Sequence, residues 1–146
     1  MTYLVLVSHG DFAAGLKTSL AMFAGDKVDQ VIAVGLKNGQ SADDFGVDFK
    51  AVMDTLDAED SLVLLADILG GSPLTTALNV LNEMGRLTGT VVVGGMNLPM
   101  ALTAVVMKDV LEGDVLASTL ISEATSALQQ FDTAPAEDEG DEEDEI

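Results

Sequence analysis

The sequence contains no cysteine and only one histidine, and both facts narrow the chemistry that it can support. Without cysteine there are no disulfides and no thiolate metal ligands, and this absence agrees with a cytoplasmic location. A zinc site built on one imidazole would have to take its other ligands from carboxylates, so we expect no metal. The glycine motifs that hold nucleotides, G-x-x-x-x-G-K-[ST] and G-x-G-x-x-G, do not occur, so no nucleotide cofactor is expected either.

Basic residues and long apolar runs are also scarce. Six lysines and arginines face 25 aspartates and glutamates, which gives a formal net charge of −19 at neutral pH. Such a surface repels nucleic acid and anionic membranes and attracts basic proteins. Apolar runs such as 91–93 and 101–107 fall far short of the roughly 20 residues that cross a bilayer. Because no basic residue precedes the first apolar run, no secretory signal is predicted.

The acidic residues are unevenly distributed along the chain. Eight of them fall in the run 137–145, where almost nothing apolar is available to be buried. We therefore predict one folded domain over residues 1–132 and an acidic disordered tail over residues 133–146. The other 17 acidic residues face six basic residues, so the predicted domain keeps a net charge of about −11.

Four continuous apolar segments predict strands that are buried on both faces, as in a parallel sheet. They are residues 3–7, 31–34, 62–66 and 91–93. The segments between them have apolar residues at helical spacing. The first predicted helix covers residues 12–23, and the second follows Ser41 as its cap. The third begins with Ser72 as N-cap and Pro73 as first helical residue. The fourth begins at Pro99, and the last covers about 118–131. This alternation predicts an α/β fold with an open, mainly parallel four-stranded sheet and helices on both faces.

In open sheets of this kind, ligands bind where the carboxyl ends of the strands meet the following loops. Three such loops carry unusual chemistry, at residues 8–11, 67–73 and 94–99. We expect them to converge on one crevice. The first contains His9, and the second begins with Asp67.

An imidazole can hold a phosphoryl group in a form that is ready for onward transfer. Transfer needs one ring nitrogen without a proton, which is secured when the other donates its proton to a fixed acceptor such as Asp67. Gly70 and Gly71 allow close approach of the backbone, and a helix that begins at Ser72 offers free N–H groups to an anion. Each of these patterns also has a second interpretation. The glycine turn fits a tight turn before a well-capped helix, and His9 fits a histidine without a functional role.

The segments 5–10, 64–73 and 94–100, in this order and at these intervals, resemble the IIA components of the mannose, fructose and sorbose class of the bacterial sugar phosphotransferase system. The resemblance covers about residues 3–131. It implies that His9 receives a phosphoryl group from phospho-HPr and passes it to a IIB component, which we expect to be a separate chain. It further implies that Asp67 orients His9 and that Ser72 holds the phosphate.

The resemblance also concerns assembly. Relatives form homodimers around a sheet with an added antiparallel edge strand, and we expect a homodimer here. The membrane components IIC and IID are expected to be indirect partners of this chain. We expect the apolar residues Phe12, Met22, Met96 and Met100 to serve partner docking. If Asp67 holds the proton on Nδ1, Nε2 is the nitrogen that is phosphorylated. The sugar is recognised by the membrane components and cannot be read from this chain.

Two other functions remain open at this point. One is the phosphotransferase subunit of dihydroxyacetone kinase, whose first domain resembles the same family and uses the same histidine chemistry. The other is a regulatory binding module without catalytic activity, in which His9 and the glycine turn serve a ligand or a partner.

Overall fold

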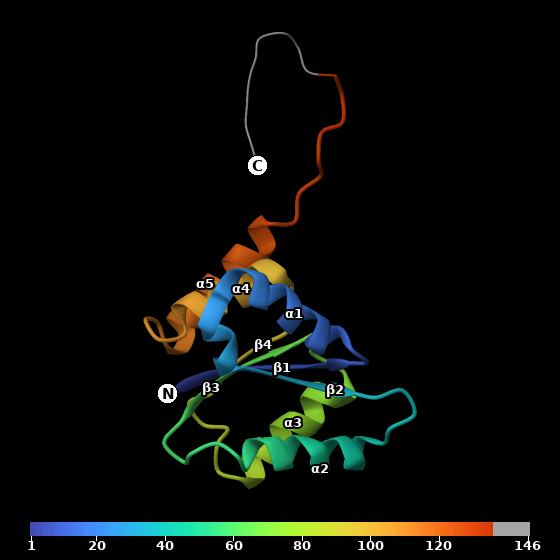
Figure 1. Cartoon of the computed structure of the whole chain (residues 1–146), viewed down its shortest axis with the longest axis vertical. Helices are drawn as coiled ribbons and strands as arrows, with labels where there is room; N and C mark the ends of the chain where they lie inside the picture. Colours follow the sequence, from blue (N-terminus) through green and yellow to red (C-terminus); the bar gives the residue numbers. More distant parts are fainter. Residues whose placement is uncertain (136–146) are drawn as a thin grey trace.

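A computed structural model describes residues 1–135 of the chain, so the tail predicted from residue 133 lies almost wholly outside the described residues. A four-stranded sheet forms its centre (Figure 1). The strands are β1 (Thr2–His9), β2 (Val31–Leu36), β3 (Ser61–Ala66) and β4 (Val91–Val93). They lie in the order β2-β1-β3-β4, and every pair is parallel. The predicted fold class is confirmed, and no antiparallel edge strand forms within residues 1–135.

Five α-helices cover the sheet in two layers (Figure 1). One layer consists of α1 (Phe12–Ala24), α4 (Leu98–Met107) and α5 (Gly113–Ser126). The other consists of α2 (Ala42–Met53) and α3 (Ser72–Glu83), and a 3-10 helix, η1 (Gly25–Gln30), connects α1 to β2. No helix of the described chain is long and apolar enough to cross a membrane.

The continuous apolar run of β1 is explained by these two layers. Leu4 and Leu6 belong to the core under α1, α4 and α5, whereas Val5 and Val7 belong to the core under α2 and α3. Because successive side chains of a strand point to opposite faces, both sets must be apolar. Each such buried side chain stabilises the fold by roughly 1.5–3 kcal/mol.

The starts of two helices test the capping predictions. Ser41 caps α2 as predicted, because its hydroxyl accepts a hydrogen bond from the N–H of Asp44 at 3.0 Å. The prediction for α3 was wrong by one residue. Gly71 occupies the N-cap position and Ser72 is the first helical residue. The physical reason lies in the backbone: Gly71 has extended angles, with φ of −91° and ψ of 162°, and its carbonyl accepts the first helical bond, from the N–H of Thr75.

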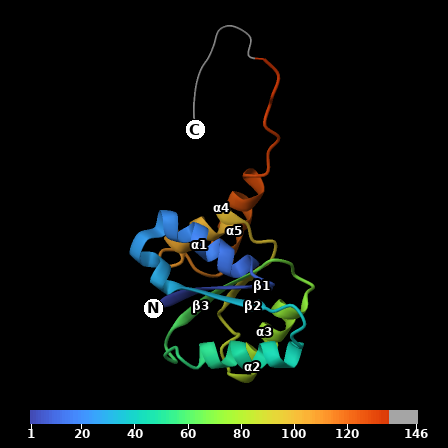
Figure 2. The ribbon, with the colours of Figure 1, turned by 45° about the vertical axis from the view of Figure 1, so that its right-hand side comes forward.

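The last helix also differs from its prediction. It covers 113–126 in place of about 118–131, and its buried stripe consists of Leu116, Leu120 and Ala124. In the sequence, Leu128 and Phe131 continue the helical spacing of the apolar residues beyond Ala124. In the structure they are 77% and 84% exposed, on a segment that leads away from the end of α5 (Figure 2). Packing on the sheet supports the helix only as far as Ala124, so the helix ends shortly afterwards.

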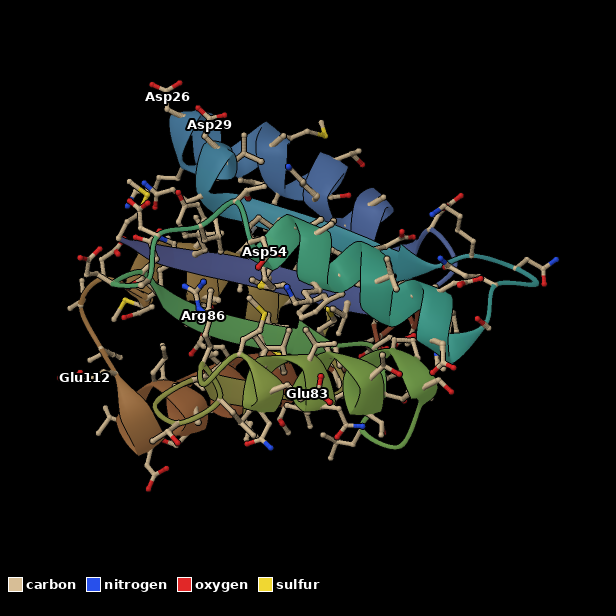
Figure 3. The ribbon with its side chains drawn as sticks, turned by 90° about the horizontal axis from the view of Figure 1, so that it is seen from below. Asp26, Asp29, Asp54, Glu83, Arg86 and Glu112 are labelled. Atoms are coloured by element: carbon tan, nitrogen blue, oxygen red, sulfur yellow. The ribbon has the colours of Figure 1, made fainter. Side chains whose placement is uncertain are left out.

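Arg86 links the loops that follow α2 and α3 at the amino-terminal edge of the sheet. Its guanidinium donates to the backbone carbonyls of Met53, Asp57 and Asp60 at 3.4, 2.9 and 3.2 Å. Figure 3 shows the layer of α2 and α3 from below, with Arg86 near Asp54 at the end of α2. The loops that follow α2 and α3 are thereby fixed at the edge opposite His9.

Candidate functional site

The strand order places a topological switch point between β1 and β3. The chain passes from β1 to β2 on one side and later returns to β3 on the other side of β1. Ligands of open α/β sheets bind at such points, outside the carboxyl ends of the strands. His9 is the last residue of β1, and Asp67 directly follows β3. The structure thus brings together the first two of the three predicted loops.

His9 and Asp67 are joined by two hydrogen bonds. Oδ2 of Asp67 accepts one from the backbone N–H of His9 at 2.9 Å and lies 2.8 Å from the ring nitrogen Nδ1. The other carboxylate oxygen accepts a hydrogen bond from the N–H of Ile68 at 2.8 Å. The His9 side chain is 48% exposed, whereas that of Asp67 is 16% exposed. The aspartate is therefore fixed, while the far side of the imidazole faces outward.

The protonation of Asp67 decides which nitrogen of His9 is free. Burial by itself would raise the pKa of the Asp67 carboxyl, but the hydrogen bonds from His9 and from the N–H of Ile68 outweigh it and hold the pKa below its ordinary value. Asp67 is thus a carboxylate at neutral pH and can only accept hydrogen bonds. Nδ1 of His9 must then be the donor. In the neutral ring, Nε2 keeps its lone pair.

Gly71 lies directly against the imidazole. A Cβ built at Gly71 would lie 2.5 Å from Cε1 and 3.2 Å from Nε2 of His9. Its backbone is extended, with φ of −91°, so conformational freedom does not require a glycine there. Gly70 differs, because a Cβ at that position would meet open space and its φ is not positive. Both glycines were predicted to bind phosphate, but only at Gly71 would a side chain collide with His9.

Ser72 is exposed at the start of α3, next to this contact. Its hydroxyl makes no hydrogen bond to any other residue of the described chain. The first backbone bond of the helix runs from the N–H of Thr75 to the carbonyl of Gly71 at 3.1 Å. The N–H groups before Thr75 have no partner within the helix and carry its partial positive charge. An anion on Nε2 of His9 would lie beside this helix start.

The third predicted loop is bonded to the end of β3 and makes no hydrogen bond with His9 within residues 1–135. The N–H of Met96 donates to the carbonyl of Ala66 at 2.9 Å, which fixes the third loop to the end of β3. Gly94 lies under the side chain of Leu69, because a Cβ at Gly94 would lie 2.4 Å from its Cγ. Asn97 caps α4 through the N–H of Met100 at 2.9 Å.

Of the four predicted docking residues, the structure excludes two. Met96 and Met100 are 4% and 3% exposed and belong to the core under α1, α4 and α5, so they cannot contact a partner. Met22 is exposed, but it lies ten residues beyond Phe12, roughly 15 Å along α1. Phe12 is half exposed and lies three residues after His9.

Two further exposed apolar residues in the loop after Asp67 were not predicted from the sequence. Ile68 and Leu69 directly follow Asp67 and are 53% and 66% exposed. Cδ1 of Ile68 would lie 3.2 Å from a Cβ at Gly71, so this side chain reaches the same point as the imidazole. The sequence signal was present, because two aliphatic residues stand in a glycine-rich loop outside any helical stripe. We name Phe12, Ile68 and Leu69 the apolar rim.

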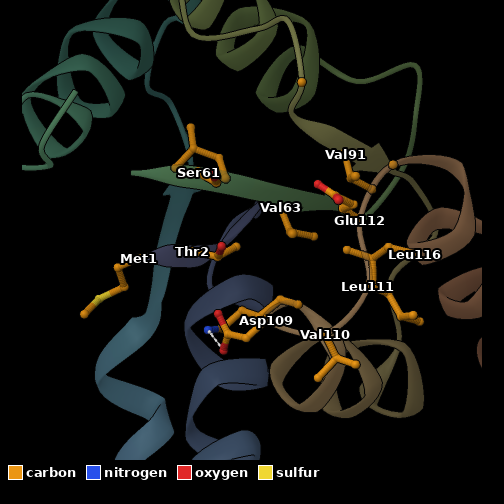
Figure 4. Close-up of a pocket in the computed structure, with 14 residues that line it drawn as sticks. Met1, Thr2, Ser61, Val63, Val91, Asp109, Val110, Leu111, Glu112 and Leu116 are labelled. Atoms are coloured by element: carbon orange, nitrogen blue, oxygen red, sulfur yellow. Dashed lines mark hydrogen bonds and ion pairs between the residues drawn. The ribbon is translucent and has the colours of Figure 1, made fainter. Parts of the chain in front are cut away.

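A cavity of about 420 Å³ lies at the opposite, amino-terminal edge of the sheet (Figure 4). Thr2, Ser61, Lys108 and Glu112 are among the residues that line it, and His9 is not. The ammonium of Lys108 is buried and donates to Gln30 and, at 2.9 Å, to Asp109. No group of three metal-ligating side chains occurs within residues 1–135. The exposed imidazole thus stands apart from this cavity.

Together these features define an open-sheet α/β protein with a histidine-centred site at its switch point. The family model described as PTS system fructose IIA component, EIIA-man, matches residues 3–121. The chain belongs to this family, and it is an EIIA component of the sugar phosphotransferase system. The description of this family supports a role of the chain in the sugar phosphotransferase system.

Individual relatives agree with the family. A fructose-specific EIIA component from Bacillus subtilis is 27% identical over 109 residues, which are 75% of this chain and 72% of that relative. The crystal structure of an EIIA component from Streptococcus agalactiae has a TM-score of 0.75 at 26% identity and covers 92% of this chain and all of its own. A mannose/sorbose-specific IIA subunit from Enterococcus faecalis has a TM-score of 0.68 at 26% identity, covering 93% and 98%.

Proposed function

We propose that this EIIA component is a cytoplasmic phosphocarrier, which accepts a phosphoryl group from phospho-HPr on Nε2 of His9 and passes it to a IIB component. The observation that carries the proposal is the contact between Nδ1 of His9 and the carboxylate of Asp67 at 2.8 Å. It leaves Nε2 unprotonated, exposed and next to the start of α3. The membrane components IIC and IID then act downstream, on the sugar.

Each transfer breaks one P–N bond and forms another. Nε2 of His9 attacks the phosphorus with its lone pair, and the imidazole of the donor leaves with the electron pair of the broken bond. The proton on Nδ1 stays between the ring and Asp67, where the carboxylate stabilises the positive charge that develops on the imidazole. In the onward step, the acceptor group of the IIB component attacks the phosphorus, and Nε2 of His9 leaves with the electron pair of its P–N bond.

The start of α3 supports the charge of the transferred group. The free N–H groups of a helix N-terminus and its partial positive charge favour an anion. Ser72 contributes a hydroxyl that is exposed and without a partner among residues 1–135, so it is available to donate to a phosphoryl oxygen. Few groups surround the phosphate, which suits a carrier that must release it again.

Two properties of the surface suit a protein partner. Residues 1–135 carry a net charge of about −11, which attracts a basic protein such as a donor with a positive surface. The residues of the apolar rim follow His9 or Asp67 within three positions of the chain, so a partner that covers the rim helps to exclude water from the phosphoryl group during transfer. Donor and acceptor must reach the same nitrogen, so they use this surface in turn.

The proposal includes a homodimer that forms through the layer of α1, α4 and α5. Helix α4 has no charged residue, and its outward Val106 is 59% exposed. The only charged residues of α1 and α5 are Lys17, Asp114 and Glu123. Two copies that each carry −19 repel one another unless their uncharged faces meet, which favours this layer for self-association.

The dimer is tested by sedimentation velocity of the full chain. Val106→Asp should convert the dimer into a monomer, because it buries a charge in the contact. Val47→Asp is the matched control, since Val47 is 68% exposed on α2 in the opposite layer. A wild-type chain that sediments as a monomer, or a dimer that survives Val106→Asp, contradicts this part of the proposal.

The carrier function is tested by intact mass after incubation with phosphoenolpyruvate, enzyme I and HPr. We expect a gain of one phosphoryl group that is labile in acid, absent in His9→Ala, and removed again when a IIB component is added. The wild-type chain and His9→Ala should show the same circular dichroism spectrum, because the His9 side chain is half exposed and its loss leaves the core unchanged. No gain under conditions that phosphorylate a known IIA would favour the non-catalytic binding module.

A further inference from the structure

Ser8 is a buried hydroxyl immediately before His9. Within residues 1–135 only Ser8 and Lys108 are polar or charged residues that are buried, and Ser8 is completely inaccessible. Lys108 is explained by its bonds to Gln30 and Asp109. The catalytic scheme above does not use Ser8. A buried polar group is costly unless it is hydrogen-bonded, so its partner indicates its role.

The shorter hydrogen bond of Ser8 joins it to the start of α1. Its Oγ accepts a hydrogen bond from the backbone N–H of Ala13 at 2.7 Å and donates to the carbonyl of Gly10 at 3.5 Å. Asp11 occupies the N-cap position of α1, but within the described chain its side chain makes no capping bond. The helix is therefore capped from the preceding strand. This bond closes a short loop that contains His9, Gly10 and Asp11.

The other contacts of this loop lead to different elements. The N–H of Gly10 donates to the carbonyl of Leu36 in β2 at 2.7 Å, and a Cβ at Gly35 would lie 2.1 Å from the carbonyl oxygen of Gly10. The N–H of His9 donates to Asp67 after β3. The loop is thus fixed to β2, to the end of β3 and, through Ser8, to α1.

We infer that Ser8 is a positioning residue for His9, acting through the loop that it closes. Without the hydroxyl, the N–H of Ala13 is buried without a partner, and the start of α1 must move to reach water. That movement displaces the backbone of the loop, and with it the ring of His9 relative to Asp67 and Gly71. In-line transfer depends on such geometry, because a displacement of about 1 Å can lower a rate roughly 100-fold. The inference rests on the proposed transfer by His9.

The test compares Ser8→Ala with Ser41→Ala in the full chain. Both variants remove one serine hydroxyl that accepts a helix N–H, at 2.7 Å in α1 and at 3.0 Å in α2. A general loss of stability therefore affects both. Because His9 is the only histidine, nitrogen NMR of the imidazole reports on one ring without overlap. Rapid-quench transfer from phospho-HPr gives the maximal rate and the donor concentration at half of it.

In Ser8→Ala we expect the Nδ1–H signal of the bond to Asp67 to weaken or broaden. The maximal transfer rate should fall by about tenfold or more, with the half-saturating donor concentration unchanged, because the apolar rim is intact. Ser8→Thr keeps the hydroxyl and should keep the Nδ1–H signal. In Ser41→Ala both the signal and the rate should equal those of the wild type.

Two outcomes overturn the inference. The first is that Ser8→Ala keeps the Nδ1–H signal and the maximal rate at the wild-type level, as Ser41→Ala is expected to do. Ser8 would then be only a structural cap. The other is an equal loss in both variants, which would assign the effect to lowered stability. If the wild-type chain accepts no phosphoryl group, the proposed function fails, while the NMR comparison still shows whether Ser8 positions the ring.

Discussion

The backbone of Gly71 and the imidazole of His9 lie so close together that a Cβ at Gly71 would be 2.5 Å from Cε1 of the ring. Gly71 is also the N-cap residue of α3. One contact therefore places the partial positive charge of a helix start next to the nitrogen that we propose as phosphoryl acceptor. It also explains why the glycine is needed at a position where the backbone itself would accept any residue.

Gly71→Ala should leave the fold intact and impair transfer. The His9 ring is half exposed and can turn away from a methyl group, but it then loses its place between Asp67 and the start of α3. We expect the rate of phosphoryl transfer to fall roughly 100-fold. Gly70→Ala is the control, since a Cβ there meets open space. Equal rates in the two variants would refute the contact as the reason for Gly71.

Asp67→Asn should slow acceptance of the phosphoryl group by about 100-fold. The amide is neutral, so it no longer stabilises the positive charge that develops on the ring, and it can turn its NH₂ group toward Nδ1. In that case Nε2 carries the proton and cannot attack. Rapid-quench measurements at saturating phospho-HPr give this rate. An unchanged rate in Asp67→Asn would remove Asp67 from the mechanism.

The same carboxylate predicts how stability depends on pH. In the folded chain the pKa of Asp67 lies below its ordinary value of 3.8. A lowered pKa means that the ionised group stabilises the fold above pH 3.8, and that this contribution is lost as the pH falls through the folded pKa. Urea unfolding should therefore find Asp67→Asn less stable than the wild type at neutral pH. The difference should shrink below about pH 3.8, and a difference that grows on acidification would contradict the assignment.

Ser72→Ala should separate catalysis from capping. The hydroxyl makes no bond within residues 1–135, so its removal should change the free energy of unfolding by less than about 0.5 kcal/mol. Loss of a hydrogen bond to a charged phosphoryl group costs about 1.5–3 kcal/mol, which is roughly a 10- to 100-fold slower transfer. Ser41→Ala should show the reverse pattern, with about 1 kcal/mol of lost stability and normal transfer. A destabilised Ser72→Ala would restore the capping role that the sequence suggested.

The apolar rim should govern the affinity for partners. Replacing both Ile68 and Leu69 with serine removes exposed apolar surface beside His9 and leaves the imidazole and Asp67 in place. We expect the donor concentration at half-maximal rate to rise about tenfold, equivalent to about 1.4 kcal/mol of binding free energy. Val47→Ser, on the exposed face of α2, should have no effect. The rim is not a docking surface if donor affinity is equal in both proteins.

Much of the fold followed from local pattern. Continuous apolar runs marked all four strands, because a strand between two helix layers has no polar face. The helix that follows Ser41 was also predicted correctly, since an N-cap acts within four residues. The last helix was misplaced because Leu128 and Phe131 match the spacing of a buried stripe but have no surface to pack against.

By itself, the sequence determined the strand and helix order, the class of the fold and the two side chains, His9 and Asp67, that meet at the switch point. These depend on periodicity and on the types of residue at strand ends, which are local properties. Only the tertiary structure decided that Gly71 and not Ser72 caps α3, that Met96 and Met100 are buried, and that Ser8 caps α1. Each of these depends on which atoms of separate elements come within a few ångströms of one another, and spacing along the chain does not encode such distances.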